Sequence, residues 1–195
     1  METIVDQLKT VNSKSFVNEI KNPEIITNLI LKNFNNETNW EELNKFTKLK
    51  EIQLKNCLID NNSFFSSIST IKNLKVFRYS SDCYFKNSEK KIKINPISIE
   101  KVVLDFYNTE EINLSLLSLK DNHNNFINSF PNFPNAYQNL KEVEFNNYDA
   151  FLDYVKKEDY DYEYLDLYKG KDLFYNCDIY NLSRLKKLEN IIFTK

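Results

Sequence analysis

The sequence predicts an α/β fold in which short parallel strands, one from each repeat, build a curved sheet and helical or irregular segments return across its other side. Two observations lead to it: a short apolar pattern recurs along the chain, and the intervening segments carry apolar residues three or four apart. The first pattern is typical of strands that bury one face, and the second of amphipathic helices. The 195 residues, 42% of them hydrophobic, suffice for one domain with a substantial core.

The clearest copy of the pattern is LKEIQLKNCLI, residues 49–59, with apolar or cysteine side chains at positions 1, 4, 6, 9 and 11. Positions 4 and 6 are two residues apart, so both side chains face the same side of a strand. Copies start at Ile26, Leu49, Leu74, Ile99, Leu114, Leu140, Tyr162 and Leu188. Six of the seven spacings are 22 to 26 residues, and the one from Ile99 to Leu114 is 15. We interpret the Leu114 copy as a short repeat; the alternative is one repeat with an insertion over 99–140.

In chain order, the copies predict seven strands that pair in parallel and follow one another across the sheet. These strands are expected near 29–31, 52–54, 77–79, 102–104, 143–145, 165–167 and 191–193. Between the first three, apolar residues at spacings of three or four predict helical returns over 40–49 and 64–74. An unrelated α/β protein with alternating strands and helices is the alternative, but it does not explain why the phase of the pattern is kept.

Residues 1–25 precede the first copy and are expected to form an N-terminal helical cap. Two apolar stripes at helical spacing support it, one including Ile4 and Val5 and one including Phe16 and Val17, and Pro23 marks its end. A cap of this kind covers the open apolar end of a stack of repeats. The last strand pattern, over 191–193, is expected at the opposite edge.

The repeating unit resembles that of the leucine-rich repeat family, L-x-x-L-x-L-x-x-N/C-x-L, at every specified position of residues 49–59. This resemblance covers about residues 26–193 and implies a solenoid of seven or eight repeats over 26–195, with the parallel sheet on its concave face. It also implies a non-catalytic protein that recognises another protein on that face. Position 9 departs from the family, since only Cys57 and Asn122 conform in the first seven copies.

Because position 9 is irregular, the turns that leave the strands need other polar groups. Asn33, Asn56 and Asn147 follow three of the predicted strands and are expected to satisfy those turns one by one. A continuous asparagine ladder at position 9 is therefore not expected.

Composition excludes several functional classes. A single glycine excludes a P-loop and a dinucleotide fingerprint, and a single histidine excludes a multi-histidine metal site. The net charge of −2 argues against wholesale nucleic-acid binding. No catalytic constellation is visible and no cofactor is implied, so we expect a protein that is not an enzyme.

Compartment is indicated by the cysteines and by the hydropathy pattern. Three sparse cysteines, Cys57, Cys83 and Cys177, argue against a disulfide framework and favour a reducing environment. No stretch has the roughly 18 apolar residues of a membrane span, and the N-terminus has no signal-peptide pattern. We therefore expect a cytoplasmic protein that does not engage a membrane. Cys57 occupies a core position of the best repeat and is expected to be structural.

The candidate binding residues are those at the outward positions 3, 5 and 7 of the copies. They are Gln53, Arg78, Asp105, Glu142, Glu144, Tyr164, Asp166 and Tyr168. Residues 98–195 carry 11 basic and 17 acidic side chains, and tyrosines alternate with acids around 159–168. Tyrosine is enriched at binding hot spots, and acids complement a basic partner.

These observations favour a partner protein with a basic surface, held toward the C-terminal end of the concave face. Two functions are compatible with such a surface. One is a general interaction module, and the alternative is a dedicated inhibitor or immunity-type protein that neutralises a basic toxin or enzyme.

Overall fold

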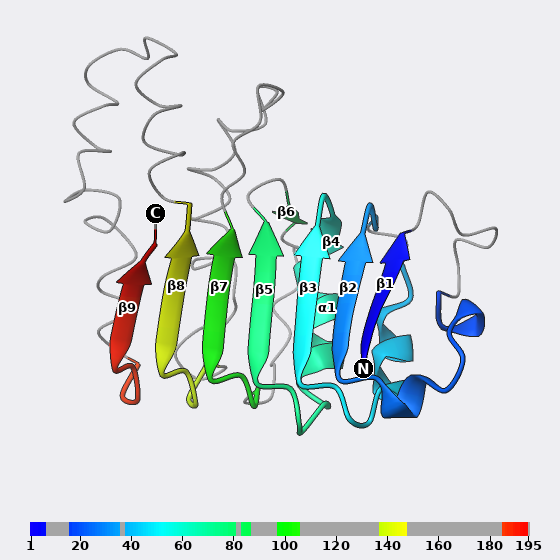
Figure 1. The fold of residues 1–195 in the computed structure, drawn as a ribbon, viewed down its shortest axis with the longest axis horizontal. Coiled ribbons are helices and arrows are strands. Elements are labelled where there is room, and N and C mark those ends of the chain that lie inside the picture. Colours follow the sequence, from blue (N-terminus) through cyan, green and yellow to red (C-terminus); the bar gives the residue numbers. More distant parts are fainter. Residues whose placement is uncertain are drawn as a thin grey trace, which may run out of the picture.

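The computed structural model describes residues 1–6, 16–35, 38–80, 83–86, 97–105, 137–147 and 185–194. They form an α/β fold whose main element is a seven-stranded, all-parallel sheet (Figure 1). Across the sheet the strands are β1 (Glu2–Asp6), β2 (Asn28–Lys32), β3 (Glu51–Lys55), β5 (Val76–Ser80), β7 (Lys101–Asp105), β8 (Glu142–Asn146) and β9 (Asn190–Phe193). Six of these strands coincide with predicted ones, and their parallel pairing in chain order is confirmed.

The register of the sheet keeps equivalent positions of the repeats side by side. Leu29, Ile52, Phe77, Val102 and Val143 are paired in one continuous row across β2 to β8, and all are buried. They occupy position 4 of their copies, and the position-6 residues from Leu31 to Leu104 are buried in the same way. The prediction that positions 4 and 6 face the core is therefore confirmed for β2, β3, β5 and β7 and for position 4 of β8, whereas Ile191 and Phe193 of the edge strand β9 are 44% and 47% exposed.

The returns on the core side are shorter and less regular than predicted. The α-helix α1 (Asn61–Ile68) lies behind β2 and β3, and the predicted return over 40–49 contains a 3-10 helix, Trp40–Lys45, instead of an α-helix (Figure 1). The side chain of Asp60 accepts a hydrogen bond from the Ser63 amide at 2.9 Å, so α1 begins before the predicted segment 64–74. Two further 3-10 helices span Val17–Glu19 and Pro23–Ile25.

A second, two-stranded parallel sheet was not predicted. It pairs β4 (Leu58–Asp60) with β6 (Tyr84–Lys86), in the segments that follow β3 and β5. Aromatic rings fill the space between this side and the main sheet, where Phe64 packs edge-on against Trp40 and Phe65 and also contacts Phe77. These rings make the core in this part of the chain mainly aromatic.

The N-terminal segment corrects one prediction. Residues 2–6 form the edge strand β1, paired in parallel with β2, so the helical interpretation of the stripe that contains Ile4 and Val5 is wrong. Val5 is buried while Ile4 is 55% exposed, which is the alternation of a strand. The second stripe does contribute to the core, since Phe16 and Val17 are buried beside Phe34 and Trp40.

The order of strands corrects two more predictions. β7 pairs directly with β8, so no strand from the Leu114 copy lies between them, and the interpretation of that copy as a separate short repeat is wrong. β8 pairs directly with β9, so the predicted place of 165–167 between 143–145 and 191–193 is also wrong. The Leu114 copy and residues 165–167 themselves lie outside the described residues.

Asparagines close the turns at the ends of the strands, as predicted. Asn33, Asn56 and Asn147 follow β2, β3 and β8 with positive φ angles of 61°, 48° and 55°. Asparagine tolerates this left-handed conformation better than most residues. Asn56 Nδ2 donates to Asn33 Oδ1 at 2.7 Å, and Asn33 Nδ2 donates to Asp6 Oδ1 at 2.8 Å, so these turns are linked across three strands. In the part of the chain that the structure describes, no helix has the length and hydropathy needed to cross a membrane.

Candidate functional site: a polar network on the outer face of the sheet

The outer face is defined here as the side of the main sheet opposite the hydrophobic core. It carries positions 3, 5 and 7 of each strand, which are the positions predicted to bind a partner. The structure places all of the predicted residues from β3 to β8 there: Gln53, Arg78, Asp105, Glu142 and Glu144. Tyr164, Asp166 and Tyr168 lie outside the described residues, and the strand position predicted for them is the one that the β8–β9 pairing excludes.

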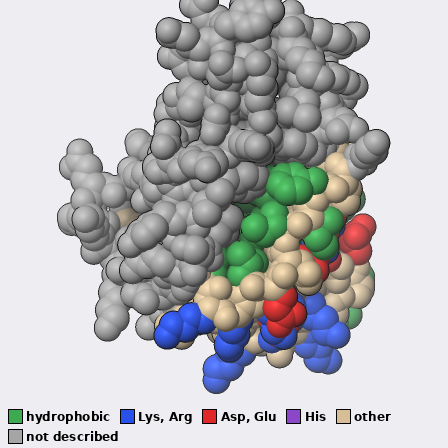
Figure 2. Space-filling model, turned by 90° about the vertical axis from the view of Figure 1, so that its left-hand side faces the viewer, with side chains coloured by type: hydrophobic (Ala, Val, Ile, Leu, Met, Phe, Trp, Pro, Cys, Tyr) green, Lys and Arg blue, Asp and Glu red, His purple; other side chains and the backbone are tan. Residues whose placement is uncertain are grey.

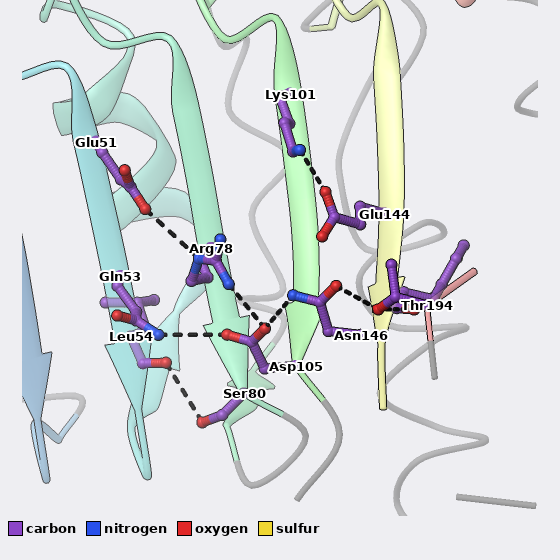
Figure 3. A network of polar contacts seen from close by, with 11 residues as sticks. Glu51, Gln53, Leu54, Arg78, Ser80, Lys101, Asp105, Glu144, Asn146 and Thr194 are labelled. Atoms are coloured by element: carbon purple, nitrogen blue, oxygen red, sulfur yellow. Dashed lines mark hydrogen bonds and ion pairs between the residues drawn. The ribbon is translucent and has the colours of Figure 1, made fainter. Parts of the chain in front are cut away.

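Asp105, the last residue of β7, is the centre of a polar network on this face (Figure 3). Its carboxylate accepts hydrogen bonds from Gln53 Nε2 at 3.3 Å, from Arg78 Nη1 at 2.9 Å and from Asn146 Nδ2 at 2.8 Å. The donors come from β3, β5 and β8, so one carboxylate links three strands to β7. Because Asp105 is only 8% exposed, its charge holds these side chains in place and is scarcely presented to solvent.

A serine at the end of β5 adds a hydrogen bond between β5 and β3 beside this network. Ser80 is paired in register with Asp105 and lies on β5, between the strands of Gln53 and Asp105. Its hydroxyl points toward the backbone, donating to the Leu54 carbonyl oxygen at 3.3 Å, and the residue is fully buried. The same hydroxyl lies 3.6 Å from the thiol of Cys83, which belongs to the hydrophobic core.

The network continues to the last strand of the sheet. Asn146 Oδ1 accepts a hydrogen bond from Thr194 Oγ1 at 2.7 Å, while Asn146 Nδ2 donates to Asp105 (Figure 3). Thr194 directly follows β9. Polar side chains from β3 to the end of β9 are therefore held in one connected set, which restricts their rotamers before any ligand arrives.

Two cations on this face are each shared by two carboxylates. Arg78 contacts Glu51 at 3.4 Å as well as Asp105, and Lys101 contacts Glu142 at 2.6 Å and also pairs with Glu144. Lys55, at the outward end of β3, is a third cation on this face, so three positive and four negative side chains leave an excess of one negative charge over β3 to β8. All except Asp105 are half-buried, so screening by water and salt is incomplete.

The ion pairs at the C-terminal end of this cluster alter the titration of its lysine. Partial burial lowers the pKa of Lys101, but hydrogen bonds to Glu142 and Glu144 raise it more, so the pKa lies above its ordinary value. Lys101 is therefore charged at neutral pH. Its single charge cannot neutralise both carboxylates, which leaves this end of the cluster acidic.

Val103 is the member of this region that sequence reasoning missed. It occupies an outward position of β7, yet it is fully buried. Its neighbours in the register belong to the ion pairs of Arg78 and of Lys101. Arg78 lies beside it on β5 and Glu144 beside it on β8, while Lys101 and Asp105 are two residues away on its own strand. The sequence did contain a signal for it. Position 5 is polar in the copies of β3, β5 and β8 but is valine in the copy of β7.

The described cysteines belong to the core. Cys57 and Cys83 are both buried thiols, and Cys57 Sγ donates to the Lys55 carbonyl oxygen at 3.1 Å, which agrees with the predicted structural role of Cys57. Within the described ranges, no group of three histidine, cysteine, aspartate or glutamate side chains is arranged to hold a metal ion.

The described residues thus define an α/β protein with an open, all-parallel sheet and a connected polar network across one face. In comparisons with known proteins, the chain matches no family model, no curated protein and no solved structure. The geometry of the sheet and the charges on its outer face are therefore the basis for assigning a function.

Proposed function

We propose that this chain is a non-catalytic, cytoplasmic protein-interaction module, built as a leucine-rich-repeat-like solenoid, that binds a partner protein on the outer face of its sheet. The partner contributes basic side chains toward β7 and β8. One observation carries the proposal: on β3 to β8, two cations are shared by four half-buried or buried carboxylates. This leaves an acidic excess on a face that is already ordered.

The solenoid part of the proposal is supported by the way that each repeat joins the next. The carbonyl oxygen of Lys50 accepts hydrogen bonds from the amides of Lys75 and Val76, at 2.7 and 3.0 Å. The same double acceptance recurs at Thr27, Lys75, Glu100 and Lys141. Each repeat therefore contributes one strand with the same entry geometry, as a stack of equivalent units requires.

Binding on the outer face is favoured by the rigidity of its polar groups. A side chain that is already held by neighbours loses less conformational entropy when a partner binds. Glu142 and Glu144 are oriented by Lys101, and a partner's arginine or lysine could replace or share that cation. Complementary charge accelerates encounter and aligns the partner, whereas affinity comes mainly from the apolar and aromatic contacts around it.

A capture experiment with matched variants tests the proposal. Purified wild-type chain is compared as bait with Glu142→Gln/Glu144→Gln and with a control, Glu24→Gln/Glu41→Gln, which removes the same charge from exposed residues elsewhere. A partner of this face is recovered by the wild type and the control, is lost with the outer-face variant, and binds the purified chain directly. Equal recovery with all three baits would contradict the proposal.

The inhibitor function differs from the general module in the kinetics of the same complex. An inhibitor forms a single slowly dissociating complex with a basic toxin or enzyme and abolishes its activity. A general module exchanges several partners rapidly. Dissociation rates and an activity assay on the captured partner separate the two functions.

A further inference from the structure

The edge of the main sheet at which the strands begin carries a second charged surface, of opposite sign. The four residues before each described strand of this sheet contain seven lysines, and every one of them is exposed. The same windows contain three acids, Glu24, Glu100 and Glu189, which leaves an excess of four positive charges. In Figure 2 the Lys and Arg side chains gather at the lower end of the molecule, where the strands in Figure 1 begin.

The position of these lysines follows from the repeat. Position 2 of the copies, directly before the strand, holds Lys50, Lys75 and Lys141, and Lys48 and Lys72 lie just upstream in two of them. Neighbouring parallel strands are about 4.8 Å apart. The regular register of the sheet therefore brings these lysines into one row, although Lys50 and Lys75 are 25 residues apart in sequence and Lys141 lies 66 residues after Lys75.

The row divides into an internally paired part and an unpaired part. Lys75 and Lys141 both contact Glu100, at 2.6 and 2.8 Å, so one carboxylate occupies two of the cations. Among the described residues, Lys48, Lys50 and Lys72 have no carboxylate within 4.0 Å. They come from two adjacent repeats, those of β3 and β5, and present three ammonium groups to solvent.

We propose that the lysines before β3 and β5 form a docking surface for a short acidic segment of a partner polypeptide. Carboxylate side chains of such a segment pair with Lys48, Lys50 and Lys72. The surface is distinct from the outer face, because these residues precede the strands and carry the opposite charge. The proposal therefore does not depend on the function assigned to the outer face.

The chemistry of the row favours an acidic polypeptide over a nucleic acid. All of its cations are lysines, and no described exposed aromatic residue lies in the windows that precede the strands, whereas single-stranded nucleic acids are held by aromatic stacking. The unpaired part also covers only two repeats. Glu100 interrupts the row of lysines on one side, and the outer face is acidic. A long polyanion therefore extends onto negative charges that repel it, whereas a short segment does not reach them.

The test uses the full chain and three labelled probes, two of them matched in negative charge and one neutral, in a fluorescence-anisotropy titration at low and at physiological salt. The probes are an octaglutamate peptide, an octaglutamine peptide and an oligothymidylate with eight phosphates. We expect the octaglutamate to bind, to weaken as salt is raised and to exceed both other probes. Lys50→Glu/Lys72→Glu should weaken octaglutamate binding by about tenfold or more.

The matched control is Lys32→Glu/Lys55→Glu, which makes the same charge change at the opposite ends of neighbouring strands. At physiological salt it should change the affinity for octaglutamate by less than about twofold, since screening limits charge effects over more than a Debye length of about 8 Å. Far-ultraviolet circular dichroism verifies that both variants are folded. The proposal is overturned if octaglutamate does not bind at low salt, if the two variants weaken binding equally, or if the oligothymidylate binds more tightly than the peptide.

Discussion

Asn56 shows how a single side chain can serve the repeat in two ways. It adopts a left-handed φ of 48° directly after β3, and its Nδ2 donates to Asn33 Oδ1 at 2.7 Å. We expect Asn56→Ala to lower the free energy of unfolding by about 1–2 kcal/mol, because a Cβ-bearing residue without a local polar group is disfavoured in this conformation. Asn56→Gly accepts the conformation and should be clearly less destabilised. Urea denaturation measures both variants, and equal losses would mean that the backbone conformation is not the cause.

Glu100 makes a pH-dependent contribution to stability. Hydrogen bonds from Lys141 and Lys75 lower the pKa of its carboxyl from an ordinary 4.5 to about 2. A depressed pKa stabilises the folded state above the ordinary pKa, and this contribution is lost as the pH falls from about 4.5 through about 2. The difference in melting temperature between the wild type and Glu100→Gln should therefore shrink over that interval. A difference that is the same at pH 3 and pH 7 would argue against this ion-paired arrangement.

At the scale of the elements, α1 depends on the residue that precedes it. The Asp60 side chain accepts the Ser63 amide at 2.9 Å and satisfies one of the unpaired donors of the first turn. Asp60→Ala should cost about 1 kcal/mol of stability, and Asp60→Asn, which keeps an acceptor, should cost much less. Thermal or urea unfolding gives both values. If the asparagine variant is as unstable as the alanine variant, the capping bond is not what Asp60 contributes.

The strands were more predictable than the segments between them. Positions 4 and 6 of each copy must both face the core, so their spacing identifies a strand even when the residues differ, as with Phe77 and Tyr79. β1 was missed because Ile4 and Val5 also fit a helical stripe, and only pairing with β2 decides between the two. The 3-10 helix at Trp40–Lys45 has the same apolar spacing as an α-helix, so periodicity could not separate them.

At the scale of the whole molecule, the sequence identified the outer face but not the contacts on it. The register follows from the repeat, and it placed Gln53, Arg78 and Glu144 in one row across the sheet, with Val103 between the last two. That Asp105 is buried as the common acceptor depends on donors from three other strands, Gln53, Arg78 and Asn146, reaching one carboxylate. Such combinations across strands follow from the direct pairing of β7 with β8 and of β8 with β9, which the spacing of the copies did not predict.

The arrangement of charge gives the molecule two surfaces of opposite sign. The outer face of β3 to β8 carries four carboxylates around two cations, whereas the edge at which the strands begin carries exposed lysines. Net charge alone, at −2, indicates neither surface. This separation follows from the repeat, because position 2 is a lysine in the copies of β3, β5 and β8, whereas the carboxylates of the outer face occupy outward positions of the strands.

The central claim is that the outer face binds a basic partner. The most direct test measures the rate at which the captured partner associates with the wild type, with Glu142→Gln/Glu144→Gln and with the control Glu24→Gln/Glu41→Gln. Each rate is measured at two salt concentrations. Removing two half-buried carboxylates should slow association severalfold at low salt, the difference should narrow at high salt, and the control should behave as the wild type. Association rates that are the same for all three proteins and independent of salt would contradict the account.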